Sequence, residues 1–376
     1  MAGIYIHVPF CQSRCAYCDF YSTTLIAHRK DYVDAVCREL HHRLPELQGE
    51  PISTIYLGGG TPSTLSIEEL KRILEPLCNF ESLDNPSLEI TLEANPDDLT
   101  EEYVQGLLTL PINRVSIGIQ SFHDRTLRLV GRRHTAQEAI DAVKRLQCHG
   151  LTNISIDLIY GLPGETLDDW TRSLDQAIAL GVKHISAYHL TYEEGTRLWR
   201  MQEQGLVAPI DEEQSIRSFE LLREKLLAAG YEHYEISNFA LPGYHSRHTS
   251  SYWQGTAYIG VGPGAHSYDG RNRRWNLSNL TDYMATLPGH DVPHEVEYLT
   301  TDERYDERII TELRTARGID LTQLKADFGE SYYTHCMHCA TPYMERKQLL
   351  LTTDNHLQLT PESIFISDAV MRDLLF

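Results

Sequence analysis

Short β-rich runs alternate with longer helical segments between residues 3 and 229. The β-rich runs contain Ile, Val, Tyr or Leu and are bounded by Gly, Pro or Asn. They cover residues 3–8, 54–57, 88–93, 114–120, 153–160 and 184–190, and helical patterns cover residues 28–47, 66–78, 100–108, 135–149, 167–180 and 211–229. Because parallel strands need long crossover connections, this series of β–α units predicts an α/β fold with a parallel sheet. Periodicity does not distinguish an open sheet from a barrel.

Three cysteines follow the first β-rich run at the spacing C-x3-C-x2-C. Cys11, Cys15 and Cys18 lie on one expected loop, so their thiolates can serve one soft metal centre. A closed structural zinc site or a fully ligated iron–sulfur cluster takes four protein ligands, whereas this local group has three. The spacing therefore favours a [4Fe–4S] cluster with one iron left free for a small molecule. A zinc loop completed by a distant residue is the alternative.

A glycine-rich loop ends the second β-rich run, where Gly58, Gly59 and Gly60 are followed by Thr61. Glycines let the backbone approach a ligand where a Cβ would obstruct it. The Gly-Lys-Ser/Thr sequence of a phosphate loop does not follow them. Taken alone, the stretch predicts either a tight turn or a binding loop.

Polar side chains stand near the ends of three later β-rich runs, at Glu93, Gln120 and Asp157. A carboxylate or an amide among Ile, Leu and Val is costly to bury unless a partner satisfies it. A bound polar cofactor would do so, and the three together favour this interpretation. For each one singly, a hydrogen-bonded core group or a strand-end cap is the alternative.

The C-terminal part has a different pattern. Residues 231–268 are rich in aromatics, His, Ser and Gly and have little helical periodicity. Helical patterns at 300–317 and 321–328, a β-hairpin at 349–360 and a final helix at 361–375 suggest a small winged-helix-like module. We therefore predict three parts: a barrel over residues 1–240, a connecting segment over 241–295 and a winged-helix-like domain over 296–376.

Charge and hydropathy limit the class of partner. The chain has 33 Lys and Arg against 53 Asp and Glu, a net charge of −20. This balance repels nucleic acid and anionic membranes, so we expect no nucleic-acid partner, and residues 271–274 form the densest basic patch. The start lacks a basic leader, and no apolar run reaches membrane-spanning length. We therefore expect a cytoplasmic protein with reduced cysteines and no integral membrane segment, in which Cys336 and Cys339 are an incidental pair.

The cysteine loop, the glycine-rich loop and the strand-end side chains resemble the radical SAM superfamily. Within it, the chain closely resembles the branch of oxygen-independent coproporphyrinogen III dehydrogenases and HemW-type heme chaperones, from Tyr5 through Tyr268 and more weakly through the hairpin. It implies a partial (β/α)6 barrel, similar to a TIM barrel, with its ligand site at the carboxyl ends of the strands. It also implies a [4Fe–4S] cluster on Cys11, Cys15 and Cys18, with S-adenosylmethionine chelating the open iron.

The same resemblance implies which residues surround S-adenosylmethionine. Tyr5 and Tyr17 lie beside the cofactor, Gly59, Gly60 and Thr61 take its methionine end, and Glu93, Gln120, Arg132 and Asp157 surround its carboxylate, ribose or adenine. Arg132 is assigned by resemblance alone, because its own pattern is that of a solvated helix charge. The implied chemistry is one-electron cleavage of S-adenosylmethionine to methionine and a 5′-deoxyadenosyl radical, which the cofactors supply.

Two features favour the chaperones over the dehydrogenases. The dehydrogenase pattern has a further cysteine two positions after the third, whereas Cys18 is followed here by Asp19 and Phe20. The dehydrogenases also have additional sequence ahead of the tyrosine that corresponds to Tyr5. Both differences favour the heme chaperones of this branch.

A heme motif of the chaperones, H-N-x-x-Y-W, is kept in part. The chain has His248, Tyr252 and Trp253, but Thr249 replaces the asparagine. An imidazole can ligate heme iron, and the two aromatic rings offer a flat apolar surface to a porphyrin. We therefore predict His248 as the heme ligand, with His245 and His266 as the next candidates. A hydrogen-bonded loop histidine beside core aromatics is the alternative.

Together these features predict a radical SAM heme chaperone that binds heme as cargo and passes it to acceptor hemoproteins. The resemblance also implies dimer formation, which makes a homodimer a further expectation. One alternative is a coproporphyrinogen III dehydrogenase that decarboxylates two propionates, an activity that we do not expect here. A zinc-binding regulator that uses the winged-helix-like end is another.

Overall fold

The parallel sheet predicted from the β–α series is the centre of the fold. The computed structural model describes residues 2–79 and 87–376. Its six central strands pair in parallel in the order of the sequence: β1 (Ala2–Val8), β2 (Ile52–Gly59), β3 (Glu89–Ala94), β4 (Arg114–Gln120), β5 (Ile154–Tyr160) and β6 (His184–His189). The predicted strands and their parallel pairing are confirmed.

The central strands are extended on both sides. Beyond β1 lie β9 (Tyr258–Val261), which is parallel to β1, and then the antiparallel β10 (His266–Tyr268), β11 (Asn272–Asn276) and β12 (His294–Tyr298). Beyond β6 lie the antiparallel β8 (Asn238–Ala240) and β7 (Glu232–Glu235). Residues 241–295, which we expected to connect two domains, therefore contribute strands to the main sheet.

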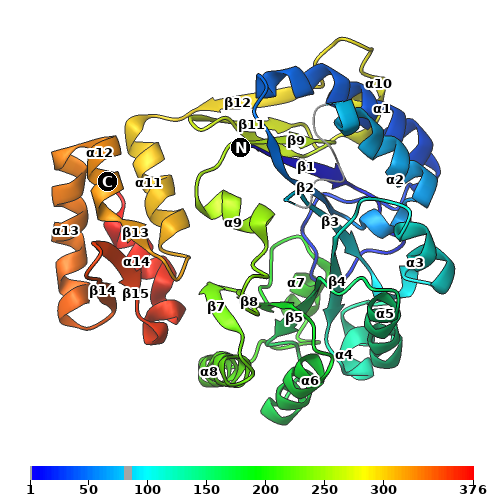
Figure 1. Ribbon diagram of the computed structural model, residues 1–376. Coiled ribbons are helices and arrows are strands. Elements are labelled where there is room, and N and C mark those ends of the chain that lie inside the picture. The colour runs from blue at the N-terminus through cyan, green and yellow to red at the C-terminus, as the bar shows by residue number, and fades with distance from the viewer. Residues whose placement is uncertain (1, 80–86) are drawn as a thin grey trace.

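Helices cover the outer side of the curved sheet (Figure 1). The six predicted helical segments contain α1 (Arg29–Arg43), α2 (Ile67–Leu74), α3 (Glu101–Leu107), α5 (Ala136–Cys148), α6 (Leu167–Ala179) and α8 (Glu212–Ala228). Within residues 2–79 and 87–298, four short α-helices lie outside those segments: α4 (Asp124–Leu129), α7 (Arg197–Glu203), α9 (Arg247–Trp253) and α10 (Leu280–Ala285). Each has two turns or fewer, too short to show helical periodicity in the sequence.

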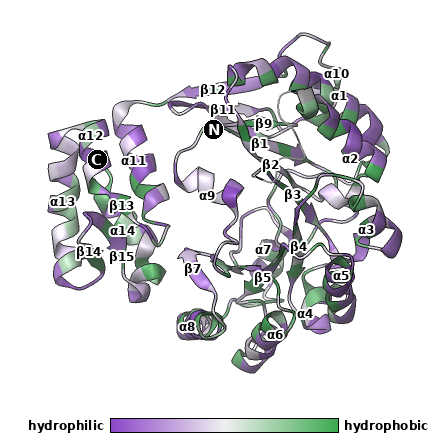
Figure 2. Cartoon of the chain, viewed as in Figure 1, coloured by the Kyte–Doolittle hydropathy of each residue, from purple (hydrophilic) through white to green (hydrophobic). Residues whose placement is uncertain are grey.

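The strands alternate between an apolar outer face and a polar inner face, as a period of two requires. The outward residues are apolar and buried in the main core with the helices, for example Ile4 and Ile6 of β1 and Ile117 of β4. Hydrophobic residues along the strands and on the surrounding helices are visible in Figure 2. The inward residues of the same strands are mostly polar: Tyr5, His7, Thr54, Tyr56, Thr91, Glu93, Arg114, Ser116, Gln120, Ser155, Asp157, His184 and Ser186. A complete TIM barrel fills its interior with branched apolar side chains, so this lumen is built to satisfy polar groups instead.

The C-terminal domain has its own core. It consists of α11 (Thr301–Glu312), α12 (Leu321–Phe328), α13 (Glu330–Glu345), α14 (Ser367–Leu374) and a small sheet of β13 (Ile319–Asp320), β15 (His356–Leu359) and β14 (Leu349–Leu351). The predicted hairpin is confirmed, because Leu349 pairs with Leu359 across β14 and β15. Cys336 is fully buried in the core of this domain. In Figure 1 the domain lies beside the barrel, with α11 nearest to α9.

Candidate cofactor site at the carboxyl ends of the strands

A cavity of about 530 Å³ lies at the carboxyl ends of the central strands. It is lined by every residue that we predicted for the cluster and for S-adenosylmethionine: Tyr5, Cys11, Cys15, Tyr17, Cys18, Gly59, Gly60, Thr61, Glu93, Gln120, Arg132 and Asp157. Parallel strands end at one edge of the sheet, which explains why residues far apart in the sequence meet here. Their individual roles stay predictions, but their convergence on one cavity is a finding.

The cysteine loop is held against neighbouring segments by backbone hydrogen bonds. The Cys11 N–H donates to the Thr23 carbonyl at 2.9 Å, and the Ala16 N–H donates to the Val130 carbonyl at 2.8 Å. The Thr61 hydroxyl donates to Cys11 Sγ at 3.4 Å. Burial raises the pKa of Cys11, and it raises the pKa of Cys18 to about 11. Iron binding at these thiols would therefore release protons.

The three cysteines suit a polynuclear cluster. All three are free thiols that face the same cavity. In a cubane cluster each thiolate binds a different iron, and three soft thiols that line one cavity suit such a cluster.

The glycine-rich loop lies directly against β1 and the residues that follow it. The Gly60 N–H donates to the Val8 carbonyl at 2.8 Å, and a Cβ on Gly60 would lie 2.8 Å from that oxygen. Gly59 has a φ of +109°, and a Cβ there would lie 2.6 Å from the ring of His7. The conformation and the space both require glycine, so the loop exposes bare backbone to the cavity.

The inward carboxylates are desolvated by the surrounding protein. The Tyr56 hydroxyl donates to Glu93 Oε1 at 2.7 Å, and the Gly59 N–H donates to Glu93 Oε2 at 3.1 Å. Burial raises the pKa of Glu93 to about 7 despite these bonds. Burial also raises the pKa of Asp157, whose Oδ1 accepts a hydrogen bond from Ser116 at 3.4 Å. A cationic ligand in the cavity would favour the ionised form of both groups.

Arg132 bridges the cysteine loop and two strand ends. Its guanidinium donates to Cys15 Sγ at 3.4 Å, to Asn95 Oδ1 at 2.6 Å and to the Gly118 carbonyl. It lies in the loop after α4, where the sequence has no strand-end signal. Gln120, at the end of β4, has a φ of +71°, and the pairing of β4 with β5 is irregular at this point. Such backbone strain is typical of functional sites.

Several residues that line the cavity were missed by the sequence analysis. Tyr188 and His189 end β6, and Asn95 and Ser116 flank Glu93 and Asp157. The strand-end rule that identified Glu93 could have identified Tyr188 and His189 as well. Asn95 and Ser116 carry no signal in the sequence that separates them from ordinary polar residues.

His248 lies at the opposite end of the barrel. Its backbone N–H donates to Glu89 Oε1 at 3.1 Å, and Glu89 begins β3. The residue is only 1% exposed, and its ring has Nδ1 2.8 Å from Thr54 Oγ1 and Nε2 2.7 Å from the Tyr252 hydroxyl. Burial lowers the pKa of His248 to about 3. Both ring nitrogens are engaged, so heme ligation by His248 stays a prediction, and it requires Tyr252 to release Nε2.

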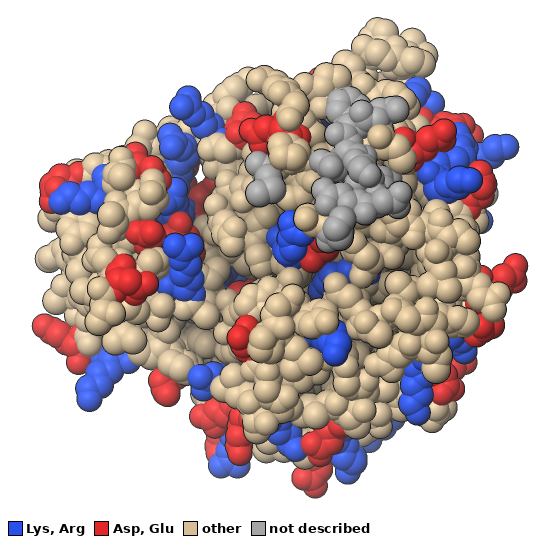
Figure 3. Space-filling view, viewed as in Figure 1, with Lys and Arg blue, Asp and Glu red and all other residues tan. Residues whose placement is uncertain are grey.

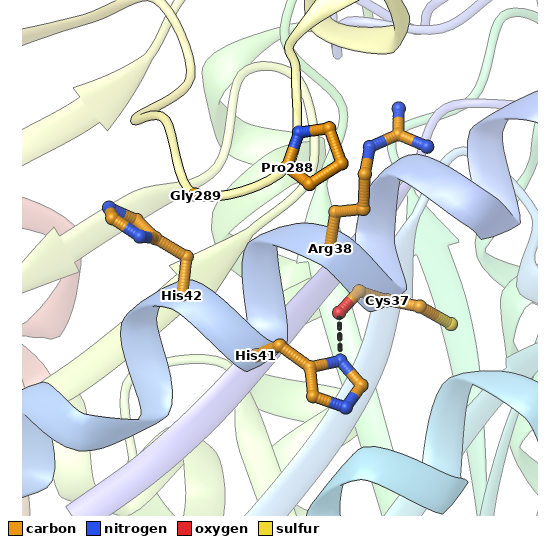
Figure 4. Close-up of a pocket in the computed structure, with 6 residues that line it drawn as sticks. All are labelled: Cys37, Arg38, His41, His42, Pro288 and Gly289. Atoms are coloured by element: carbon orange, nitrogen blue, oxygen red, sulfur yellow. Dashed lines mark hydrogen bonds between the residues drawn. The ribbon is translucent and has the colours of Figure 1, made fainter.

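A separate surface pocket on α1 is lined by Cys37, Arg38, His41, His42, Pro288 and Gly289 (Figure 4). Its polar groups are used in local contacts. His41 Nδ1 lies 2.7 Å from the Cys37 carbonyl, and the Cys37 thiol donates to the Arg72 carbonyl at 3.3 Å. Arg38 donates to the Met284 carbonyl at 2.9 Å. These contacts fasten α1 to its neighbours, so we assign no chemistry to this pocket.

Comparisons with known proteins agree with this geometry. Residues 5–177 match the model of the Radical SAM superfamily, and residues 299–366 match that of the HemN C-terminal domain. The chain is 36% identical to the heme chaperone HemW of Mycobacterium tuberculosis, covering 99% of this chain and 94% of that protein. It is 33% identical to the heme chaperone HemW of Lactococcus lactis, and this match covers 99% of this chain and 96% of that protein.

Among solved structures, coproporphyrinogen III oxidase (HemN) from Escherichia coli, a radical SAM enzyme, matches with a TM-score of 0.84. The match covers 100% of this chain and 90% of that one at 21% sequence identity. At this identity the match shows a shared fold. It includes the C-terminal domain as well as the barrel.

Proposed function

The chain belongs to the heme chaperone HemW family of the radical SAM superfamily, and from this premise we propose that it binds heme and passes it to acceptor hemoproteins. The observation that carries the proposal is the identity of 33–36% to named heme chaperones over 99% of the chain. The cysteine loop adds to it, because Asp19 and Phe20 follow Cys18 where the dehydrogenase pattern has a further cysteine.

We propose that Cys11, Cys15 and Cys18 hold a [4Fe–4S] cluster and that S-adenosylmethionine occupies the rest of the cavity. Three soft thiol donors beside a glycine-rich loop and two partly buried carboxylates fit these groups. When bound, the cluster supplies one electron for cleavage of the sulfonium. The protein positions the cofactor through the bare backbone of Gly59 and Gly60, and it places Glu93 and Asp157 to balance positive charge.

Arg132 is proposed to position the cluster and the cofactor relative to each other. The Nη1 group of its guanidinium donates to Cys15 Sγ, and the Nη2 group donates to Asn95 Oδ1 and the Gly118 carbonyl. A cation beside the thiolates stabilises their ionised form. The same cation lies within the cavity wall, where a carboxylate of a ligand can reach it.

The alternative function is oxidative decarboxylation of coproporphyrinogen III. The fold match to HemN, with a TM-score of 0.84, is the observation that favours it. That match is at 21% identity and concerns a fold that chaperone and enzyme share, whereas the heme chaperones are more similar in sequence. We therefore keep the chaperone as the proposed function.

None of the helices in the described parts of the chain is long and apolar enough to span a membrane. The cytoplasm remains the location that we propose for the protein. A homodimer, as the family resemblance implies, is part of the proposal and would be measured by light scattering on the reconstituted protein.

The proposed function is tested with anaerobically reconstituted protein in two assays. Heme-loaded protein mixed with an apo-hemoprotein is expected to transfer its heme, followed as a change in the heme absorbance. Incubation with coproporphyrinogen III, S-adenosylmethionine and a reductant is expected to give no protoporphyrinogen. Formation of that product, or retention of all heme by the protein, would contradict the proposal.

A matched pair of cysteine variants controls for the cluster. Cys15→Ala is expected to lose cluster iron, because Cys15 is a proposed ligand in the cavity wall. Cys339→Ala is expected to keep it, because Cys339 lies in the C-terminal domain 3.7 Å from His335 Nε2. Equal iron content in the two variants would remove Cys15 from the ligand set.

A further inference from the structure

A second cavity, of about 350 Å³, lies between the barrel and the C-terminal domain. The barrel contributes the end of α9, the loop after it and residues of β9, β10 and β11, whereas the C-terminal domain contributes one side of α11 and Phe328 of α12. The surface is hollowed along the border of the two domains in Figure 3. Tyr258 in the cavity wall pairs with Gly3 at the start of β1, so this cavity lies at the end of the barrel opposite the cysteines.

The lining of this cavity has a small excess of basic side chains, whereas the protein as a whole is strongly acidic. Its lining includes Arg273, Arg304 and Arg308 against Glu307 and Glu312. Arg273 is paired with Glu307, and Arg308 lies 3.2 Å from Glu312 and 2.9 Å from Asp327, which lies outside the lining.

Arg304 is the cation of this cavity that is free for a ligand. Among residues 2–79 and 87–376, no carboxylate lies within ion-pair distance of it, and its guanidinium stands over the ring of Phe328 at 5.7 Å. The side chain is half-buried, so a partner there is only partly exposed to water. A guanidinium in this setting binds carboxylates more strongly than one in full solvent.

Aromatic rings form the rest of the wall. Tyr252, Trp253, Tyr258, Tyr268 and Phe328 line the cavity. Flat rings and an unpaired cation together suit a planar conjugated ligand that carries carboxylates.

We propose that this cavity binds the carboxylate-bearing edge of the tetrapyrrole cargo, with Arg304 as the anchor of a propionate and the aromatic wall against the ring. This inference rests on the proposed function, since it assumes that the cargo is heme. A volume of about 350 Å³ is at the small end of ligand sites, which range over about 300–1,000 Å³, and it suits one edge of the ring. Glu307 and Glu312 disfavour polyphosphates, which carry more charge than a propionate.

The two cavities are joined by a continuous series of aromatic rings. The centroids of Tyr258 and Tyr252 are 4.6 Å apart, those of Tyr252 and His248 5.0 Å, and those of His248 and Tyr5 6.3 Å. Tyr258 and Tyr252 line the second cavity, and Tyr5 lines the first. His248 therefore supports the wall of the second cavity through its hydrogen bond to the hydroxyl of Tyr252, which lines that cavity.

The test compares protoporphyrin IX with its dimethyl ester, whose carboxylates are blocked, on full-length reconstituted protein. Binding of each is titrated by fluorescence and absorbance, and hemin is titrated in parallel. Arg304→Gln is expected to weaken binding of the free acid about tenfold, because a charge-assisted hydrogen bond is lost. Binding of the ester is expected to be weaker in the wild type and unchanged by the substitution. Arg304→Lys is expected to retain part of the affinity for the acid.

The matched control is Arg172→Gln, which removes an exposed arginine of α6 that pairs with Asp169. It is expected to bind both porphyrins like the wild type. Equal affinity of Arg304→Gln and wild type for the free acid, or an equal loss for acid and ester, would overturn this inference alone. Failure of the wild type to bind hemin and both porphyrins would overturn the proposed function together with it.

Discussion

Glu93 combines two properties that a structural core residue avoids. It carries a titratable group, and its neighbours in β3 are Leu92 and Ala94, both buried. The Tyr56 hydroxyl and the Gly59 N–H satisfy its oxygens, yet burial still raises its pKa to about 7. Such a carboxyl group lowers the stability of the ligand-free protein near neutral pH. A cationic ligand that stabilises the ionised carboxylate when bound best explains its presence.

This raised pKa predicts how stability depends on pH. The unfolded chain releases the Glu93 proton near its ordinary pKa of 4.5, whereas the folded chain keeps it until about pH 7. The contribution of the protonated Glu93 carboxyl group to the free energy of unfolding is therefore fully present below pH 4.5 and is lost as the pH rises to about 7. The loss is on the order of 3 kcal/mol. Glu93→Gln does not titrate, so its stability relative to wild type is expected to rise between pH 5 and pH 8, measured by urea unfolding without ligands.

The control for this experiment is Glu68→Gln, at an exposed position of α2. Its difference from wild type is expected to be the same at both pH values. A pH-independent difference for Glu93→Gln would show that the folded protein holds this carboxylate ionised.

At the scale of residues, the predictions from sequence were best where a polar side chain stood among apolar residues of its own strand. Glu93 and Asp157 stand out because their neighbours in sequence are apolar, and Cys11, Cys15 and Cys18 stand out by spacing. Arg132 has no such contrast, since an arginine after a helix is ordinary, and its role arises from Cys15 and Asn95, which are distant in sequence. For His248 the motif is visible in the sequence, but the burial of the ring is not, because Thr54 and Glu89 are brought to it only by the fold.

The loop after β2 is the element on which the cavity depends most directly. Gly59 takes a φ of +109° to bring the chain from the end of the strand to the cysteine loop. The ring of His7 that faces it is fixed by Tyr5 at 3.1 Å and by the Tyr21 carbonyl at 3.0 Å. The ring therefore has no free direction in which to make room for a Cβ.

Gly59→Ala is expected to cost about 3 kcal/mol, because it combines a disfavoured backbone conformation with a clash against a fixed ring. Gly49→Ala is the matched comparison, since Gly49 also has a positive φ, of +85°, but no described atom lies within 4 Å of the added Cβ. It is expected to cost about 1 kcal/mol. Urea unfolding gives both values, and titration with S-adenosylmethionine is expected to show weaker binding for Gly59→Ala only. Equal losses would mean that the His7 ring moves.

Long β–α elements were predicted from sequence because each contains enough residues to show its own period. The strands β9 to β12 and helix α9 were not, because they are short and owe their structure to distant partners. Tyr258 is extended because it pairs with Gly3, and α9 is held by bonds from its first turn to Glu89. Pairings with residues that are distant in the sequence cannot be predicted from a local sequence pattern.

The whole molecule places two cavities at opposite ends of one polar lumen. The first is closed by the cysteine loop at the carboxyl ends of the strands, and the second by the C-terminal domain at their amino ends. The predicted partial barrel and hairpin-containing end domain are confirmed, but the second cavity could not be predicted. It exists only where α9, β9–β11 and α11 meet, and these elements come from separate parts of the chain.

This arrangement predicts that S-adenosylmethionine and heme affect each other's binding. Tyr5 borders the first cavity and Tyr252 the second, and His248 lies between them in contact with both rings. In cluster-loaded protein, saturating S-adenosylmethionine is expected to tighten heme binding about fivefold, and heme is expected to tighten S-adenosylmethionine binding by the same factor. Anaerobic titration of each ligand with and without the other measures both factors.

Tyr252→Phe tests whether the coupling passes through this series of rings. It removes the hydroxyl bonded to His248 Nε2 at 2.7 Å but keeps the aromatic ring in the cavity wall. The factor by which each ligand changes the affinity of the other is expected to fall toward one, because the position of His248 no longer depends on the wall of the second cavity. Tyr298→Phe, at a side chain that is 77% exposed on β12, is expected to keep the wild-type factor. Heme binding to wild type that is indifferent to S-adenosylmethionine would show that the two ends of the barrel act independently.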